Sequence, residues 1–201
     1  MFILASQSPR RRLILEQMGL SFRVESSQFD EATLQNQLVT GHAGMLADPG
    51  ILVEALAKGK AQEVASRHPH DLVLGADTVV VWEGTILGKP HSPAEAIAML
   101  RQLSGHTHEV FTGVALMGPD HDAVFHDVAK VEFNPLDDYQ EAAITAYVAS
   151  GQALDKAGAY GIQDAGATLI SSITGDFYTV MGLPLAKTRK LLYQWGLAFS
   201  L

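Results

Sequence analysis

The segment "ASQSPRRR" near the N-terminus combines a helix start with three positive charges. Ser8 is a typical N-cap, and Pro9 is tolerated at the first helical position. The first turn of a helix carries unpaired N–H groups and a partial positive charge, so Arg10, Arg11 and Arg12 are unfavourable there. A bound anion would account for them, because donors and positive charge would converge on it. The alternative is that the arginines extend into solvent or pair with distant carboxylates, and this segment alone does not decide between the two.

A second helix start in the same chain has the ordinary charge pattern. In "HSPAEAIAML", Ser92 and Pro93 are followed by Glu95, three residues after the serine. This spacing predicts a capping box, in which the serine and the glutamate bond each other's backbone N–H groups. The first start has Arg11 at the equivalent place. Helix stability therefore accounts for the second start and leaves the arginines of the first unexplained.

Three further segments place charged or polar groups beside strand ends and glycines. Asp77 lies inside the apolar run "LVLGADTVVV", and a buried carboxylate is costly unless it is paired or binds a metal. Lys89 lies in the turn "ILGKP", and Gln163 ends the glycine-rich run "LDKAGAYGIQ". Each feature has a structural explanation when taken singly. Together they provide cations for phosphate oxygens, a carboxylate for a metal or a water, and an amide for a base edge, which suits polyphosphate hydrolysis.

Composition limits the classes of protein that fit. The chain has 201 residues, a formal net charge of −8 and no cysteine. We expect one domain, which could have two lobes, and no nucleic-acid partner, because the surface as a whole would repel phosphates. A phosphate site must then be a local basic pocket. Disulfides, thiolate metal sites and cysteine catalysis are excluded. Apolar runs are too short for a membrane span, and the N-terminus does not resemble a signal peptide, so we expect a cytoplasmic protein.

Several common nucleotide and metal motifs are absent from the sequence. It has neither GxxxxGK[ST] nor a GxGxxG after a strand, which argues against a P-loop enzyme and against dinucleotide binding. The pairs His68/His70 and His106/His108 lack the helical spacing of zinc hydrolases, and we expect surface histidines.

Periodicity and turn residues predict alternating strands and helices. We expect strands at 1–5, 21–25, two within 71–90, and at 107–117, 122–133, 167–175 and 177–183. We expect helices at 9–18, 48–67, 92–103, 136–150 and 184–195, and a loop at 26–48 that could hold one helical turn. This mixture favours an α/β or α+β fold with a mixed sheet flanked by helices.

Taken in order, the segments resemble the Maf family of nucleoside triphosphate pyrophosphatases, also called septum formation proteins. The resemblance runs through "ILASQSPRR", "GADTVV", "GKP", "LSGHTHEVFTGVAL", "YVASGQALDKAGAYGIQ" and "YTVMGLPL", over nearly the whole chain. It implies one Maf-like domain over 1–201, with an elongated mixed sheet, two lobes around a central cleft and the Maf/ITPase-like fold. It also implies hydrolysis of a nucleoside triphosphate to the monophosphate and pyrophosphate, assisted by Mg²⁺ or Mn²⁺.

Three positions distinguish subgroups of the family. Arg10, Thr78 and Gln163 resemble the dTTP/UTP subgroup, for which modified pyrimidine nucleotides are further candidate substrates. The subgroup that acts on 7-methyl-GTP has Trp in place of Arg10 and Gln in place of Thr78, and it lacks the Ala-Tyr-Gly-Ile-Gln run.

The resemblance assigns roles to particular side chains. It implies that Asp77 is the proton acceptor and that Lys60 and Lys89 assist catalysis. Asp77 and Glu31 are also the candidate metal ligands, and the sequence leaves open whether Asp77 acts mainly as a base or mainly as a ligand. The substrate-binding residues that it implies are Ser6, Arg10, Arg11, Thr78 and Gln163.

The chain departs from the family pattern at three places. Gly59 stands where the family usually has Glu, the segment 33–50 is atypical, and "GQALDKAG" replaces a more usual Gly-Glu-Pro before Asp-Lys-Ala-Gly.

Two other functions stay open on the sequence alone. The chain could be a non-catalytic, nucleotide-sensing regulator of septum formation, which would bind without releasing pyrophosphate. It could also be a purine pyrophosphatase of the ITP/XTP type, against which Thr78 and Gln163 weigh mildly. A homodimer is implied only by the resemblance.

Overall fold

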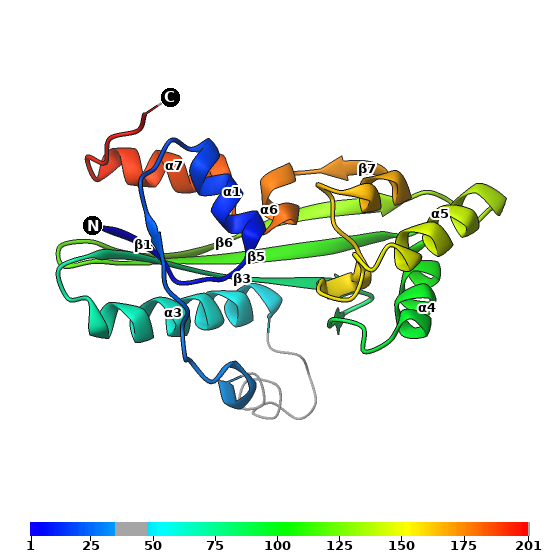
Figure 1. The fold of residues 1–201 in the computed structure, drawn as a ribbon, viewed down its shortest axis with the longest axis horizontal. Coiled ribbons are helices and arrows are strands. Elements are labelled where there is room, and N and C mark those ends of the chain that lie inside the picture. Colours follow the sequence, from blue (N-terminus) through cyan, green and yellow to red (C-terminus); the bar gives the residue numbers. More distant parts are fainter. Residues whose placement is uncertain (35–47, 201) are drawn as a thin grey trace. The chain divides into compact units, whose positions relative to one another are not determined.

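The computed structural model describes residues 1–34 and 48–200, and their strands form one mixed sheet (Figure 1). The strand order is β2-β1-β3-β5-β6-β7, and β4 pairs with β3. β1 runs parallel to β2 and β3, whereas β4 and β7 run antiparallel to β3 and β6. The strands are β1 (Phe2–Leu4), β2 (Arg23–Val24), β3 (Leu72–Trp82), β4 (Thr85–Leu87), β5 (Thr107–Met117), β6 (Asp122–Phe133) and β7 (Ile170–Thr174).

Helices flank this sheet, which confirms the predicted mixed α/β class. The α-helices are α1 (Pro9–Gln17), α3 (Pro49–Arg67), α4 (Pro93–Leu103), α5 (Asp138–Ala149), α6 (Phe177–Met181) and α7 (Leu185–Gln194). Two short 3₁₀ helices, η1 (Ala157–Ala159) and η2 (Ala165–Leu169), lie between α5 and β7. Along 1–34 and 48–200, no helix combines the length and apolar character that crossing a bilayer requires.

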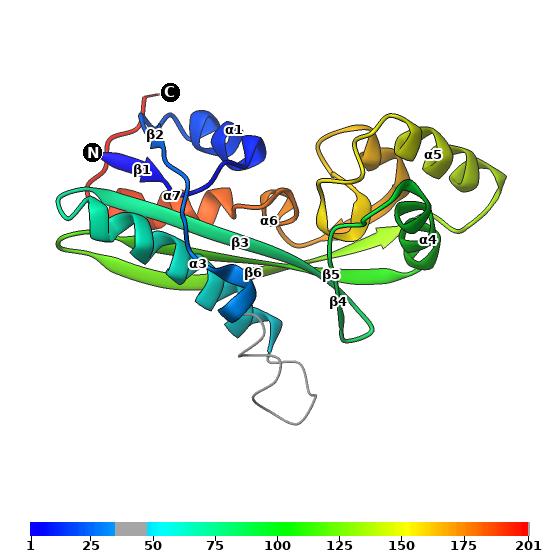
Figure 2. The same cartoon turned by 60° about the horizontal axis from the view of Figure 1, so that its bottom comes forward.

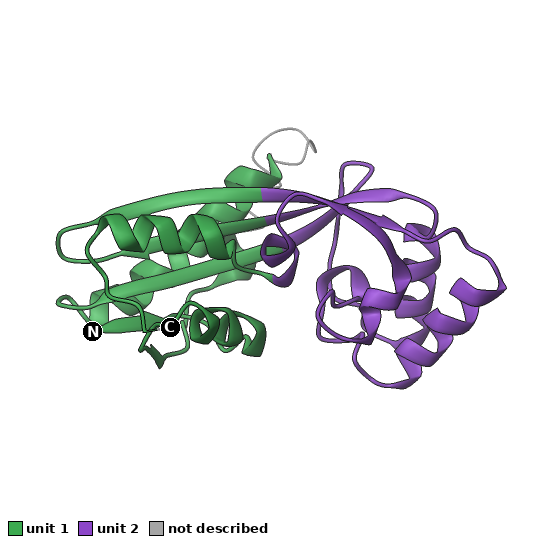
Figure 3. Cartoon of the chain, turned by 90° about the horizontal axis from the view of Figure 1, so that it is seen from above, with its two compact units in different colours: residues 1–78, 112–127, 182–201 green, residues 79–111, 128–181 purple. Residues whose placement is uncertain are grey.

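The chain forms two compact units, coloured separately in Figure 3. The first unit comprises Met1–Thr78, Thr112–Asp127 and Gly182–Leu201, and the second comprises Val79–Phe111 and Val128–Met181. Strands β3, β5 and β6 each contribute residues to both units. Most of the predicted site residues belong to the first unit, whereas Lys89 and Gln163 belong to the second. The prediction of a single domain stays a prediction.

In the first unit, helix α3 packs very close to the sheet. It lies on the face opposite α1 and α7, as the two views in Figures 1 and 2 show. A Cβ atom on Gly75 of β3 would lie 2.4 Å from the carbonyl oxygen of Ala57, and one on Gly113 of β5 would lie 2.2 Å from that of Val53. Ala57 and Ala61 of α3 are fully buried against β1 and β3. Small residues on both sides therefore fix α3, which carries Lys60, against the strand that carries Asp77.

The two predicted Ser-Pro helix starts are both present. Ser8 caps α1 by accepting from the backbone N–H of Arg11 at 3.5 Å. Ser92 caps α4 by accepting from the N–H of Glu95 at 3.2 Å, as the predicted capping box requires. The Glu95 carboxylate accepts from the N–H of His91, one residue before the serine N–H that the capping box predicts. The first turn of α1 contains no acidic residue, so its charge pattern remains unfavourable for an isolated helix.

Three predicted elements differ from the structure. The expected strand at 177–183 is wrong, because its first part is helix α6: the Asp176 side chain accepts from the N–H of Tyr178 at 3.0 Å and starts a helical turn. The expected strand at 167–175 begins later, since η2 occupies its first residues. The strand expected at 21–25 has only two residues, in β2. The helical turn that the loop at 26–48 could hold is present at 31–34, and 35–47 lie outside the described residues.

The second unit is built around an apolar core that includes a buried histidine. Phe133, Leu100, Ile144 and Leu169 are fully or almost fully buried there. His108 is only 1% exposed, so the expectation that it is a surface histidine is wrong. His108 and Val110 are two residues apart on β5, so their side chains point to the same, buried face of the sheet.

Candidate functional site

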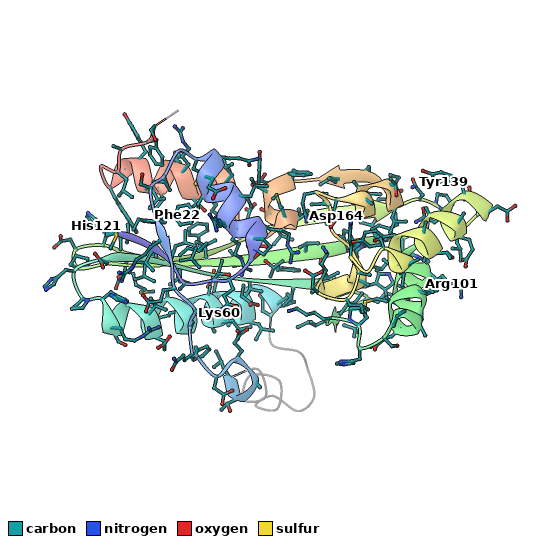
Figure 4. All side chains as sticks on the ribbon, in the orientation of Figure 1. Phe22, Lys60, Arg101, His121, Tyr139 and Asp164 are labelled. Atoms are coloured by element: carbon teal, nitrogen blue, oxygen red, sulfur yellow. The ribbon has the colours of Figure 1, made fainter. Side chains whose placement is uncertain are left out.

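A lysine on α3 forms ion pairs with two carboxylates on the face of the sheet that α3 covers. Lys60 extends from α3 (Figure 4), and its Nζ donates to Oδ1 of Asp77 on β3 at 2.6 Å. The same nitrogen lies 2.8 Å from Oε2 of Glu31. Lys60 and Asp77 are each 9% exposed, so this ion pair is largely shielded from water. The carboxylate that interrupts the apolar strand is therefore paired, as a buried charge must be.

Gly59, the departure beside Lys60, has a clear packing consequence. A Cβ atom at this position would lie 2.4 Å from the ring of Phe29. The ring thus rests directly on the α3 backbone, and the N–H of Glu31 bonds the carbonyl of Phe29 at 3.1 Å. The missing side chain allows the 29–31 segment to approach α3, which lets Glu31 reach Lys60.

A second group of polar side chains surrounds Arg11. Its guanidinium donates to the carbonyl of Gly182 at 2.9 Å, to Ser6 Oγ at 3.2 Å and to Thr78 Oγ1 at 3.1 Å. The Thr78 hydroxyl also bonds the hydroxyl of Thr112 at 3.0 Å, and Thr112 is completely buried. Desolvation lowers the pKa of Arg11, an effect that the nearby carboxylate of Asp77 opposes. The network ties the start of α1 to β3, β5 and the segment before α7.

The three arginines of α1 have different environments. Arg12 is exposed and pairs with Glu16 at 2.9 Å, one helical turn along, as in the solvent-facing alternative. Arg11 instead points into the first unit, and Arg10 is half-buried in the first turn of the helix. For Arg12, the explanation that holds is therefore that the arginine extends into solvent and pairs with a carboxylate.

The two groups lie on opposite faces of one strand. Asp77 and Thr78 are consecutive residues of β3, and successive side chains of a strand point to opposite sides. Asp77 accordingly meets α3, whereas Thr78 meets α1. The first unit thus brings the predicted residues together as two adjoining clusters. Thr112 was not predicted, although its inward-facing position in the alternating run "THEVFTGV" was a signal for a buried hydroxyl.

In the second unit, the Lys89 turn meets the glycine-rich loop that contains Gln163. The N–H of Gly158 donates to the carbonyl of Gly88 at 3.1 Å. Gly158 has a φ of +70°, which favours glycine, and a Cβ there would press on Val80 at 3.1 Å. Lys89 and Gln163 are both exposed. The backbone bond therefore brings the two predicted segments together and leaves both polar side chains accessible.

The glycine-rich loop is held from inside by a buried lysine. Lys156 Nζ lies 2.7 Å from Asp155 Oδ1 and 3.4 Å from Asp164 Oδ2, and its side chain is 8% exposed (Asp164 is labelled in Figure 4). The Tyr147 hydroxyl accepts from the N–H of Gly161 at 3.0 Å, and burial raises the pKa of this phenol. A Cβ on Gly161 would lie 2.5 Å from Asp164 Oδ2 and 2.7 Å from Lys156 Cε, so a larger residue there would displace this ion pair.

Asp77 and Glu31 are the carboxylates of the first unit that could bind a metal ion. Along the described residues, no three His, Cys, Asp or Glu side chains come close enough together to hold one ion. Asp77 and Glu31 offer two carboxylates around a single point, which is the number that Mg²⁺ commonly takes from a protein when substrate phosphates complete its shell. The pair therefore fits an ion shared with phosphates, once Lys60 Nζ has moved from between the two carboxylates.

Fold and comparison with known proteins together identify the family. A mixed sheet flanked by helices places the chain in the mixed α/β class. Residues 1–195 match the family model described as Maf-like protein, and the chain belongs to this family.

Curated relatives cover nearly the whole chain. A dTTP/UTP pyrophosphatase of Symbiobacterium thermophilum is 48% identical over 194 residues, which are 96% of this chain and 93% of the relative. A dTTP/UTP pyrophosphatase of Moorella thermoacetica is also 48% identical, over 198 residues that cover 96% of this chain and 94% of the relative. One from Shouchella clausii is 46% identical over 194 residues, or 95% and 93% of the two chains.

Proposed function

We propose that this protein hydrolyses dTTP and UTP to the monophosphate and pyrophosphate. The observation that carries the proposal is the buried ion pair between Lys60 of α3 and Asp77 of β3, in a chain whose relatives are named dTTP/UTP pyrophosphatases. Those names describe enzymes of pyrimidine nucleotides, so they favour this function over a non-catalytic sensor or an ITP-type pyrophosphatase. Arg10, Thr78 and Gln163 agree with the same substrate class.

The reaction breaks the bond between the α- and β-phosphates. A water attacks the α-phosphorus, its proton passes to Asp77, and pyrophosphate leaves with the electrons of the bridging bond. Lys60 and Lys89 would neutralise the charge that develops on the pyrophosphate. A divalent cation, Mg²⁺ or Mn²⁺, would be held by Asp77 and Glu31 together with substrate phosphates, and it would supply polarisation of a phosphoryl oxygen.

The remaining residues would bind and select the nucleotide. Arg10 and the N–H groups at the start of α1 would contact the triphosphate. Arg11 and Ser6 would hold this helix start in place through the network around Thr78. Thr78 and Gln163 would read the pyrimidine edge, since a polar site rejects substrates that leave it unpaired. We propose in addition that Lys89 and Gln163 act on the same nucleotide as the residues of the first unit. We also propose that the protein forms a homodimer.

The proposal is tested by a panel of nucleoside triphosphates, assayed for pyrophosphate with and without Mg²⁺ or Mn²⁺. We expect release from dTTP and UTP with the metal, and a fall in kcat of at least about 100-fold in Asp77→Asn, the scale of a lost acid–base group. Asp120→Asn, at an exposed turn, is the matched control and should retain wild-type kcat. A wild-type protein that releases no pyrophosphate from either nucleotide refutes the function. Unchanged kcat in Asp77→Asn removes Asp77 from the mechanism.

A further inference from the structure

Lys60 occupies the position that a cation would need between Asp77 and Glu31. Its single ammonium nitrogen lies 2.6 Å from Asp77 Oδ1 and 2.8 Å from Glu31 Oε2. Both carboxylates are thus already neutralised in part by a charge that belongs to the protein. A divalent cation at the same point would be repelled by the ammonium and would find its oxygen ligands engaged.

We propose that Lys60 is a built-in counter-cation that competes with divalent metal for the Asp77–Glu31 site and weakens metal binding until nucleotide arrives. Phosphate oxygens accept hydrogen bonds from ammonium groups strongly, so a bound triphosphate would draw Lys60 Nζ away and free both carboxylates. The identity of the nucleotide rests on the proposed function, whereas the competition between Lys60 and the metal rests only on the geometry. Metal loading would thereby become coupled to substrate binding.

The surroundings of Lys60 suit such an exchange. The backbone of α3 is fixed by its close packing on Gly75, but a lysine side chain is a flexible four-carbon stem, so the ammonium can move without the helix. The side chains of Lys60 and Asp77 are 11% and 12% exposed, whereas that of Glu31 is 46% exposed. Glu31 therefore forms the accessible side of the pair, and Phe29 on Gly59 holds it there.

The test is Mn²⁺ binding to the nucleotide-free protein, measured by isothermal titration calorimetry. Lys60→Met should bind Mn²⁺ at least about tenfold more tightly than the wild type, which corresponds to about 1.4 kcal/mol. Lys58→Met, an exposed lysine two residues away on the same helix, should bind like the wild type. Adding Asp77→Asn to Lys60→Met should return the Mn²⁺ affinity to the wild-type value or below it. Equal affinity in Lys60→Met and the wild type overturns the proposal.

A second measurement needs no variant, in case Lys60→Met does not fold. Acetylation of lysines in the wild-type protein is followed by mass spectrometry as Mn²⁺ is raised to saturation. Displacement from the carboxylates should increase the labelling of Lys60 severalfold and leave Lys58 unchanged. No increase at saturating Mn²⁺ overturns the proposal. Pyrophosphate release from dTTP and UTP by the wild type is measured separately, so failure of the proposed activity is distinguished from failure of the lysine–metal competition.

Discussion

Lowering the pH from 6.5 to 5 should destabilise this protein through His108. The imidazole is buried on β5, its Nε2 lies 2.7 Å from the Tyr160 hydroxyl, and Phe133 packs edge-on against it. Burial lowers the pKa of His108 from 6.5 to about 4. The folded protein therefore binds this proton less readily than the unfolded chain does. The stabilisation is complete above pH 6.5 and is lost as the pH falls toward 4.

The expected magnitude follows from the size of this shift. Each pH unit below 6.5 costs about 1.4 kcal/mol while the folded imidazole stays neutral, so the free energy of unfolding should fall by about 2 kcal/mol between pH 6.5 and 5. Hydrogen bonds with His68 and with the N-terminal ammonium hold the pKa values of Glu25 and Asp71 below their ordinary 4.5 and 3.8, so the stabilisation from these carboxylates is lost only in more acidic solution. The window from pH 6.5 to 5 thus lies above the range in which these carboxylates titrate, and comparison with a His108 variant separates this imidazole from the other histidines.

The assay is urea unfolding followed by circular dichroism at several pH values. His108→Gln keeps a side-chain amide that can reach Tyr160 but does not titrate, so its stability should fall by about 2 kcal/mol less than that of the wild type. His106→Gln, an exposed position two residues earlier, should follow the wild type. If His108→Gln shows the same loss between pH 6.5 and 5 as the wild type, the reasoning about burial is refuted.

Two further predictions concern the first unit. Gly75→Ala should lower the free energy of unfolding by about 1–3 kcal/mol, because its Cβ would lie 2.4 Å from the Ala57 carbonyl and push α3 outward; unchanged urea stability would contradict the close packing. Thr112→Val removes a hydroxyl from Thr78 at nearly constant volume, and the KM for dTTP should rise about 2- to 10-fold, with recovery in Thr112→Ser. Steady-state kinetics check this, and a wild-type KM in the valine variant would show that Thr78 needs no support.

The parts of the fold that were predictable are those set by local sequence. The starts of α1 and α4 follow from Ser-Pro capping, and the long strands β3, β5 and β6 follow from their apolar or alternating runs. Helix α6 was missed because "FYTVM" has the composition of a strand. The hydrogen bond that the Asp176 carboxylate accepts from the N–H of Tyr178 favours a helical turn, and composition does not encode that bond.

The site divides in the same way. Asp77 was found because a carboxylate within an apolar strand demands a partner, but only the resemblance pointed to Lys60 and Glu31 as site residues. The different environments of Arg11 and Arg12 depend on contacts that are distant in sequence, such as the bond to the Gly182 carbonyl 171 positions away. Thr112 approaches Thr78 across 34 positions for the same reason. Such pairs are set by strand order, which one sequence alone does not reveal.

The adjacency of Asp77 and Thr78 makes the length of the preceding chain as important as its composition. β3 is anchored by the alignment of Leu74 with Leu4 of β1. Deleting or inserting a single residue between that anchor and Asp77 would invert the strand from there onward, turning the carboxylate toward α1 and the hydroxyl toward α3. A single inserted or deleted residue would thus disrupt both clusters at once. Natural variants of this strand should therefore tolerate substitutions far more readily than insertions or deletions.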